Sequence, residues 1–132
     1  MTSRWTGGSL RRTTRQQSGA AAERDARRYL EAAGLEFVAQ NVRYRLGEID
    51  LVMREGECLV FVEVRYRASS RFVAPLLTVD RHKERRITQA ASLFLARNPR
   101  YASSPARFDV IAIERAPDGH TGIQWVRDAF RV

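Results

Sequence analysis

The sequence predicts an α/β domain built around a mixed β-sheet. A helical pattern is followed by three strand patterns, a second helical pattern and two further strand patterns, which is the order expected of such a domain. Residues 58–64 are almost continuously apolar, which is typical of a central strand covered on both faces. With 132 residues and 44% hydrophobic content, the chain can form one domain with a substantial core.

The N-terminal part of the chain divides into an arm and a helix. Residues 1–18 are rich in arginine and poor in apolar side chains, which predicts a disordered basic arm ahead of a single domain at residues 19–132. The arm would either contact nucleic acid or act as a solubilising tail. A helix is predicted at residues 20–33, with Gly34 as its C-terminal cap. Its apolar stripe is Ala22, Ala26, Tyr29, Leu30 and Ala33.

The remaining elements follow in order. Residues 35–42 form a strand, and residues 47–67 form a hairpin with a tight turn at Glu55-Gly56. A second helix begins at an N-cap, Thr78, and ends near residue 97, before Asn98-Pro99. Its predicted buried ridge is Ile87, Ala90, Ala91 and Phe94. Strands at residues 107–114 and up to residue 125 complete the sheet around a turn at residues 117–119.

Two carboxylates lie within the apolar hairpin. An ionised carboxylate at Asp50 or Glu63 is costly unless a cation or hydrogen bonds compensate it. Period-two geometry places Glu48, Asp50 and Val52 on one face, and the turn makes Asp50 and Glu63 diagonal neighbours on that face. A register shift of two residues would still keep both carboxylates on the same face. Converging carboxylates suit Mg²⁺, whereas a surface hairpin whose acids meet arginines is the alternative.

Three further charged residues are expected near the sheet. Glu23 lies at the edge of the first helix's stripe, where it either joins a site or stabilises the helix N-terminus. Lys83 extends the ridge of the second helix by one turn, so its side chain is predicted to lean towards the sheet. Asp109, in a later strand, is predicted to make a structural pair with Arg107 or another arginine.

The charge balance indicates a nucleic-acid partner. The net charge is +8, and of 23 Lys and Arg residues only Lys83 is lysine. Arginine suits bidentate phosphate contacts, although an acidic protein partner would also fit a basic surface. The predicted contacts are Arg43, Arg45, Arg67, Arg71, Arg81, Arg85 and Arg86. The single cysteine, Cys58, excludes a disulfide within the chain, and the lack of a signal or membrane-spanning pattern predicts a cytoplasmic protein.

Several of these motifs together resemble one family. Gly47-Glu48-Ile49-Asp50-Leu51, Phe61-Val62-Glu63-Val64-Arg65, Lys83 at a basic helix start and Arg107-Phe108-Asp109-Val110 resemble the YraN family of bacterial proteins over residues 19–130. That family is similar to the restriction-endonuclease-like, or PD-(D/E)xK, nucleases, and among them to archaeal Holliday-junction resolvases. The resemblance implies a three-layer domain with a central mixed sheet flanked by helices.

The resemblance also implies a site and an activity. Asp50, Glu63 and the backbone carbonyl of Val64 would hold Mg²⁺, or Mn²⁺ in its place, for hydrolysis of DNA phosphodiester bonds. Glu23 matches a helix-borne acid of the resolvases, and branched or structured DNA as substrate and a homodimer follow by analogy. Glu48, on the predicted face of Asp50, is expected as an accessory acid.

One position departs from the superfamily pattern. Arg65 stands where the pattern has lysine, and arginine stays protonated, so it can stabilise charge but cannot act as a general base. Lys83 is the candidate to supply an ammonium in its stead, provided that it points towards Asp50 and Glu63. The alternative is a nuclease-fold protein that binds nucleic acid without cleaving it.

Overall fold

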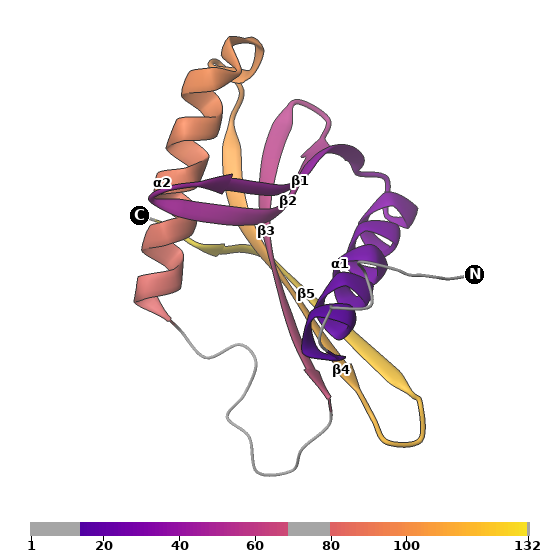
Figure 1. Cartoon of the computed structure of the whole chain (residues 1–132). Coiled ribbons are helices and arrows are strands. Elements are labelled where there is room, and N and C mark those ends of the chain that lie inside the picture. Colours follow the sequence, from indigo (N-terminus) through magenta and orange to yellow (C-terminus); the bar gives the residue numbers. More distant parts are fainter. Residues whose placement is uncertain (1–13, 69–79, 132) are drawn as a thin grey trace, which may run out of the picture.

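The computed structural model describes residues 14–68 and 80–131, which form a mixed five-stranded sheet between two helices (Figure 1). The strands lie in chain order, and all neighbours are antiparallel except β3 and β4, which are parallel. The elements are α1 Thr14–Ala32, β1 Glu36–Tyr44, β2 Gly47–Glu55, β3 Cys58–Ala68, α2 Arg81–Arg97, the 3₁₀ turn η3 Pro99–Tyr101, β4 Ala106–Arg115 and β5 Thr121–Phe130. The predicted α/β class and three-layer arrangement are confirmed.

The first helix is longer than its pattern indicated. It begins at Thr14, so the last five residues of the predicted arm are helical, while residues 1–13 lie outside the described range. Its end is capped as predicted: Gly34 has a φ of +101°, and the Leu35 N–H donates to the Leu30 carbonyl at 3.0 Å. Neither described helix is long and apolar enough to cross a membrane.

The core has two layers, one on each face of the sheet. Ala22, Ala26 and Leu30 of α1 pack against one face, and α2 packs against the other. The strand β3 is covered on both, since Val60 and Val62 face α1 whereas Leu59 and Phe61 face α2. This confirms the central position predicted for residues 58–64. The prediction that Tyr29 and Ala33 belong to the apolar stripe of α1 is wrong, because both residues are exposed.

The turn of the β2–β3 hairpin lies one residue later than predicted. Glu55 pairs with Cys58, so the turn residues are Gly56 and Glu57, and Gly56 takes the positive φ (+59°) that the turn requires. The hairpin register is therefore shifted by two residues. Continued beyond the Leu51–Val62 pair, this register sets Asp50 opposite Glu63 instead of diagonal to it.

The second half of the chain follows its predictions with local differences. Helix α2 is capped by Asp80, whose carboxylate accepts from the Lys83 N–H at 3.2 Å; the predicted cap, Thr78, lies outside the described residues. The buried ridge of α2 and its end before Asn98 are confirmed. Strand β5 continues to Phe130, five residues beyond its predicted end, because its bulged end returns to pair with Phe108 of β4.

Candidate functional site

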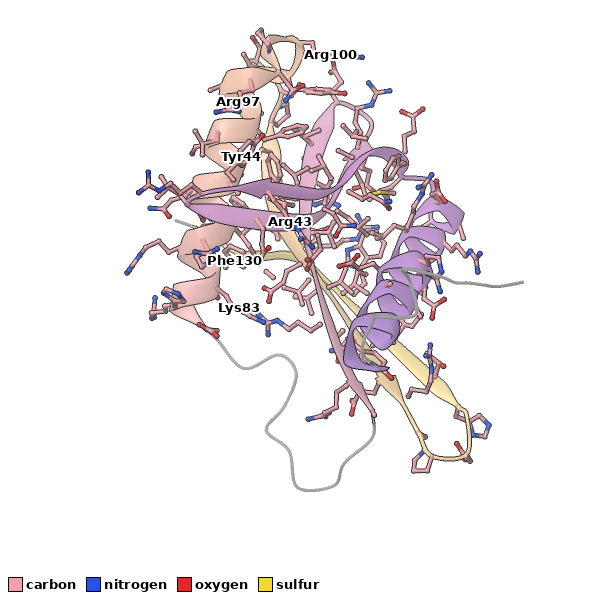
Figure 2. All side chains as sticks on the ribbon, viewed as in Figure 1. Arg43, Tyr44, Lys83, Arg97, Arg100 and Phe130 are labelled. Atoms are coloured by element: carbon pink, nitrogen blue, oxygen red, sulfur yellow. The ribbon has the colours of Figure 1, made fainter. Side chains whose placement is uncertain are left out.

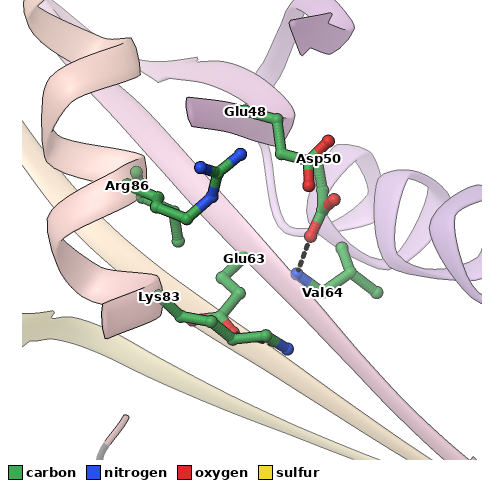
Figure 3. Close-up of a pocket in the computed structure, with 7 residues that line it drawn as sticks. Glu48, Asp50, Glu63, Val64, Lys83 and Arg86 are labelled. Carbon is green, nitrogen blue, oxygen red and sulfur yellow. Dashed lines mark hydrogen bonds and ion pairs between the residues drawn. The ribbon is translucent and has the colours of Figure 1, made fainter. Parts of the chain in front are cut away.

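A cavity of about 170 Å³ opens between the sheet and the N-terminal half of α2 (Figure 3). Strands β2 and β3 supply carboxylates to its wall, and α2 supplies cations that point across it towards the strands. The lining residues are Glu48, Asp50, Glu63, Val64, Lys83, Arg86 and Ile87. The two carboxylates singled out from the sequence therefore share one cavity.

An irregularity in β2 positions Asp50. Ile49 and Val52 both pack towards α2, and Leu51 packs towards α1, so the period-two alternation predicted for this strand is wrong here. The ladder with β1 pairs Ile49 and Leu51 but skips Asp50, and the residue that would oppose it, Asn41, has a φ of +52°. Asp50 therefore lies at a break in the regular sheet.

At this break, the Asp50 side chain takes the place of a backbone acceptor for β3. The β2–β3 ladder ends at the Leu51–Val62 pair, and the Val64 N–H donates to Asp50 Oδ2 at 2.8 Å (Figure 3). The N–H and carbonyl of one strand residue point to the same side. The Val64 carbonyl is thus directed towards the side of β3 on which Asp50 lies.

The electrostatics around Asp50 favour an added cation. Burial, the largest cause, raises the pKa of Asp50 to about 7; the Val64 hydrogen bond opposes this, and the carboxylates of Glu23, Glu63 and Glu48 add to it. The pKa of Glu23 is also raised, chiefly by burial, against a hydrogen bond from Asn41 and the charge of Arg43. A divalent cation among these acids would offset their mutual repulsion.

Glu63 is almost fully buried and is held by two cations. Arg65 donates from Nε to Oε2 at 3.0 Å and from Nη2 to Oε1 at 3.1 Å, so both carboxylate oxygens carry a guanidinium hydrogen bond. Lys83 Nζ lies 3.9 Å from Oε2. Lys83 thus lines the cavity beside Glu63, in agreement with the predicted lean of its side chain towards the sheet.

A close backbone contact fixes α2 over the cavity. A Cβ on Gly47 would lie 1.9 Å from the carbonyl oxygen of Arg86, which only glycine avoids. Sequence reasoning missed this contact, and also Asn41 beside Glu23. The only local signals were a glycine directly before Glu48 and an asparagine within a strand pattern.

The donor set fits a magnesium ion. Within residues 14–68 and 80–131, no three acidic, histidine or cysteine side chains come close enough to hold a metal ion together. Mg²⁺ characteristically takes one or two carboxylates and completes its shell with water and substrate phosphate. Asp50, Glu63 and Val64 all line the cavity, so two carboxylates and one backbone carbonyl would be the protein donors of such an ion. For Glu63 to bind a cation, one of its oxygens must give up its bond to Arg65.

The other predicted acids lie around this pair in different ways. Glu48 lines the cavity and lies 3.9 Å from Arg43. Glu23, on α1, interacts electrostatically with Asp50 but does not line the cavity. Asp109 is fully buried and bonded to Arg107 Nε at 2.9 Å, which confirms its predicted structural pairing.

The predicted nucleic-acid contacts separate by position. Arg43, Arg45, Arg81 and Arg85 are exposed, and Arg86 lines the cavity. Arg67 is instead bonded to Glu114 and its side chain is only 15% exposed, while Arg71 lies outside the described residues. Arg97 and Arg100, which the sequence did not single out, are exposed at the far end of α2, where Arg97 lies 5.2 Å from the Tyr44 ring centre (Figure 2).

Comparison with known proteins assigns the chain to a family. The sequence profile described as "Uncharacterised protein family UPF0102" matches residues 22–113, which include every residue lining the cavity. The chain belongs to this family. A UPF0102 protein of Xanthomonas campestris pv. campestris is 52% identical over 118 residues, covering 89% of this chain and 94% of the relative. The UPF0102 protein of Pseudomonas syringae pv. syringae is 43% identical over 121 residues, covering 92% and 98%.

Proposed function

We propose that this protein binds nucleic acid and hydrolyses DNA phosphodiester bonds with the help of a divalent cation, as a cytoplasmic bacterial protein of nuclease-like fold. The observation that carries the proposal is the shared cavity of Asp50 and Glu63 beneath the basic start of α2. The resemblance to the YraN family and to PD-(D/E)xK nucleases supports it, since the same two acids fill the motif positions. Branched or structured DNA, bound by a homodimer, is the proposed substrate.

Separate sets of residues would bind the cation and the phosphate. Asp50, Glu63 and the Val64 carbonyl would hold the cation, and Glu48 and Glu23 would increase the negative potential that attracts it. When bound, Mg²⁺ supplies Lewis-acid chemistry, polarising a phosphoryl oxygen and activating a water molecule. Lys83 and Arg86 face the cavity from α2 and would bind the phosphate that enters it.

The exposed arginines would orient the DNA. Arg43 and Arg45 lie at the end of β1, where Arg43 pairs with Glu48 of the cavity wall, and Arg81 and Arg85 lie at the start of α2, which lines the cavity. Contacts from such side chains to the phosphate backbone fix position without reading sequence. This suits a protein that selects DNA by shape.

A cleavage assay tests the proposal. Linear, flapped and four-way DNA would be incubated with the protein in Mg²⁺ or Mn²⁺, beside the variants Asp50→Ala and Glu63→Ala. We expect cleavage that each substitution reduces by at least about 100-fold, the scale on which single catalytic groups act. The matched control is Asp118→Ala, which removes an exposed acid at the β4–β5 turn. Cleavage that survives both site variants would refute the proposed site.

A second candidate function rests on one contact. Arg65 occupies both oxygens of Glu63, and an arginine cannot accept a proton as a lysine can. A nuclease-fold protein that binds DNA without cutting it would show this arrangement. Tight binding with no cleavage of any of the three DNA forms in either metal would favour this candidate over hydrolysis.

A further inference from the structure

The guanidinium of Arg65 occupies the place of a cation at Glu63. Its Nε and Nη2 each donate to a different carboxylate oxygen, at 3.0 and 3.1 Å, and the two side chains are 11% and 5% exposed. A forked pair of this kind is among the stronger ion pairs in proteins, and burial shields it from solvent. Glu63 is therefore compensated in the protein as it stands, and Asp50 is not.

A divalent ion and Arg65 compete for the same carboxylate. If an ion took one oxygen of Glu63, the guanidinium would lose part of its compensation in a poorly solvated site, and that loss opposes metal binding. A DNA phosphate in the cavity changes this balance, because its oxygens offer arginine the same forked geometry as a carboxylate. Lys83, 3.9 Å from Glu63 and 62% exposed, can turn to the same phosphate.

We propose that Arg65 makes cation and phosphate enter this site together, by holding Glu63 until a phosphate group takes over its guanidinium. The inference rests on the proposed function, since it assumes that Asp50 and Glu63 hold the metal and that DNA supplies the phosphate. Arg65, in place of the lysine of the superfamily pattern, would thus couple metal binding to phosphate binding. The free protein binds divalent metal weakly, and DNA and metal raise each other's affinity by the same factor, as linkage requires.

Mn²⁺ binding to the free protein tests whether Arg65 competes with a divalent ion for Glu63. Titration followed by electron paramagnetic resonance would compare the natural protein with Arg65→Gln, which removes the fork. We expect Arg65→Gln to bind Mn²⁺ at least about tenfold more tightly, since about 1.4 kcal/mol of competition corresponds to that factor. Arg65→Lys retains charge without the forked geometry, so its affinity should lie between the two. Thermal melting of each variant would confirm that it is folded.

The chain offers a matched control two residues along β3. Arg67 also pairs with a carboxylate, donating from Nε and Nη2 to Oε2 of the more exposed Glu114 at 3.1 and 2.6 Å, and it lies outside the cavity lining. Arg67→Gln removes the same charge from the same strand and should leave Mn²⁺ affinity within about twofold of the natural protein's, because it frees no ligand. Equal gains for Arg65→Gln and Arg67→Gln would overturn the inference.

DNA binding, measured without cleavage, tests whether DNA and the metal raise each other's affinity. Affinity for a phosphorothioate-linked duplex would be measured by fluorescence anisotropy with and without Mg²⁺ at constant ionic strength. We expect Mg²⁺ to raise the affinity of the natural protein at least about fivefold, and to raise that of Arg65→Gln by a smaller factor. Because the coupling is a ratio of two affinities of the same protein, a general weakening of DNA binding by the substitution cancels from it.

The outcomes separate the two proposals. Unchanged Mn²⁺ affinity in Arg65→Gln, or equal coupling in both proteins, would overturn the inference about Arg65 and leave the proposed function standing. Mn²⁺ binding that persists in Asp50→Ala and Glu63→Ala would place the metal elsewhere and overturn both. A free protein that binds Mn²⁺ as tightly as its DNA complex would contradict the role of Arg65 without any variant.

Discussion

Two aspartates lie inside this sheet in opposite electrostatic environments. Asp109 is fully buried and accepts from Arg107, from Trp125 Nε1 at 2.9 Å and from the Asp128 N–H at 2.8 Å. Asp50 accepts from the Val64 N–H and lies among other acids. The protein satisfies the first carboxylate with three donors, whereas the second accepts the Val64 N–H and is the one proposed to bind a cation. A saturated set of donors indicates structure, whereas a deficit of positive charge indicates a site.

Removing the saturated carboxylate should be costly. Asp109→Ala would leave the Trp125 N–H and the Asp128 N–H without their buried acceptor, and within the described residues Arg107 would keep its pair with Glu55, so we expect the free energy of unfolding to fall by about 3–5 kcal/mol. Urea denaturation measures this. Glu57→Ala, at the exposed β2–β3 turn, is the control and should stay within about 0.5 kcal/mol of the natural protein. A comparably small effect for Asp109→Ala would contradict the structural role.

The raised pKa of Asp50 predicts a pH-dependent stability. The carboxyl titrates near 7 in the folded protein and near 3.8 when unfolded, so between these values the folded state holds a proton that the unfolded state releases. The free energy of unfolding of the natural protein therefore falls as the pH rises from about 4 to above 7. This decrease is absent in Asp50→Asn. From pH 5 to pH 8 the variant should gain on the order of 2 kcal/mol relative to the natural protein. A stability difference between the two proteins that does not change with pH would disprove the shift.

At the scale of elements, the packing of α2 on β2 depends on one glycine. Gly47→Ala places a methyl group against the Arg86 backbone, which must move, and with it Lys83. We expect a loss of about 1–3 kcal/mol in urea unfolding and faster amide hydrogen exchange in α2. Gly122→Ala is the control, because a Cβ there would meet no atom within 4 Å. Equal behaviour of the two variants would show that the contact does not hold the helix.

Local patterns in the sequence were enough for most elements. The buried ridge of α2 follows from its helical period, the end of α2 from Asn98-Pro99, and the cap of α1 from Gly34, because neighbouring residues determine all three. The place of Asp50 depends instead on how β1 and β3 pair with β2, which no local pattern contains. Asp50 and Glu63 share a cavity, as their predicted convergence requires, but the break in alternation at Asp50 and its contact with Val64 required the tertiary structure.

For the whole molecule, the net charge of +8 predicts salt-sensitive binding to DNA. Each phosphate contact contributes about 0.9 to the slope of log affinity against log salt, so the double variant Arg81→Gln, Arg85→Gln should reduce that slope by about two. Arg24→Gln, Arg28→Gln makes the same change of charge on exposed residues of α1 and should leave the slope unchanged. Equal effects of the two pairs would show that overall charge, and not the face beside the cavity, binds DNA.

The most direct test of the central claim is the position of a metal ion in the DNA complex. Crystals of the protein with uncleaved DNA, grown in Mn²⁺, would be measured at a wavelength where manganese scatters anomalously. We expect an anomalous peak between Asp50 and Glu63, about 2.0–2.4 Å from an oxygen of each, with Arg65 turned from Glu63 to a phosphate. Density that leaves Arg65 on Glu63, with manganese bound only elsewhere, would contradict the site.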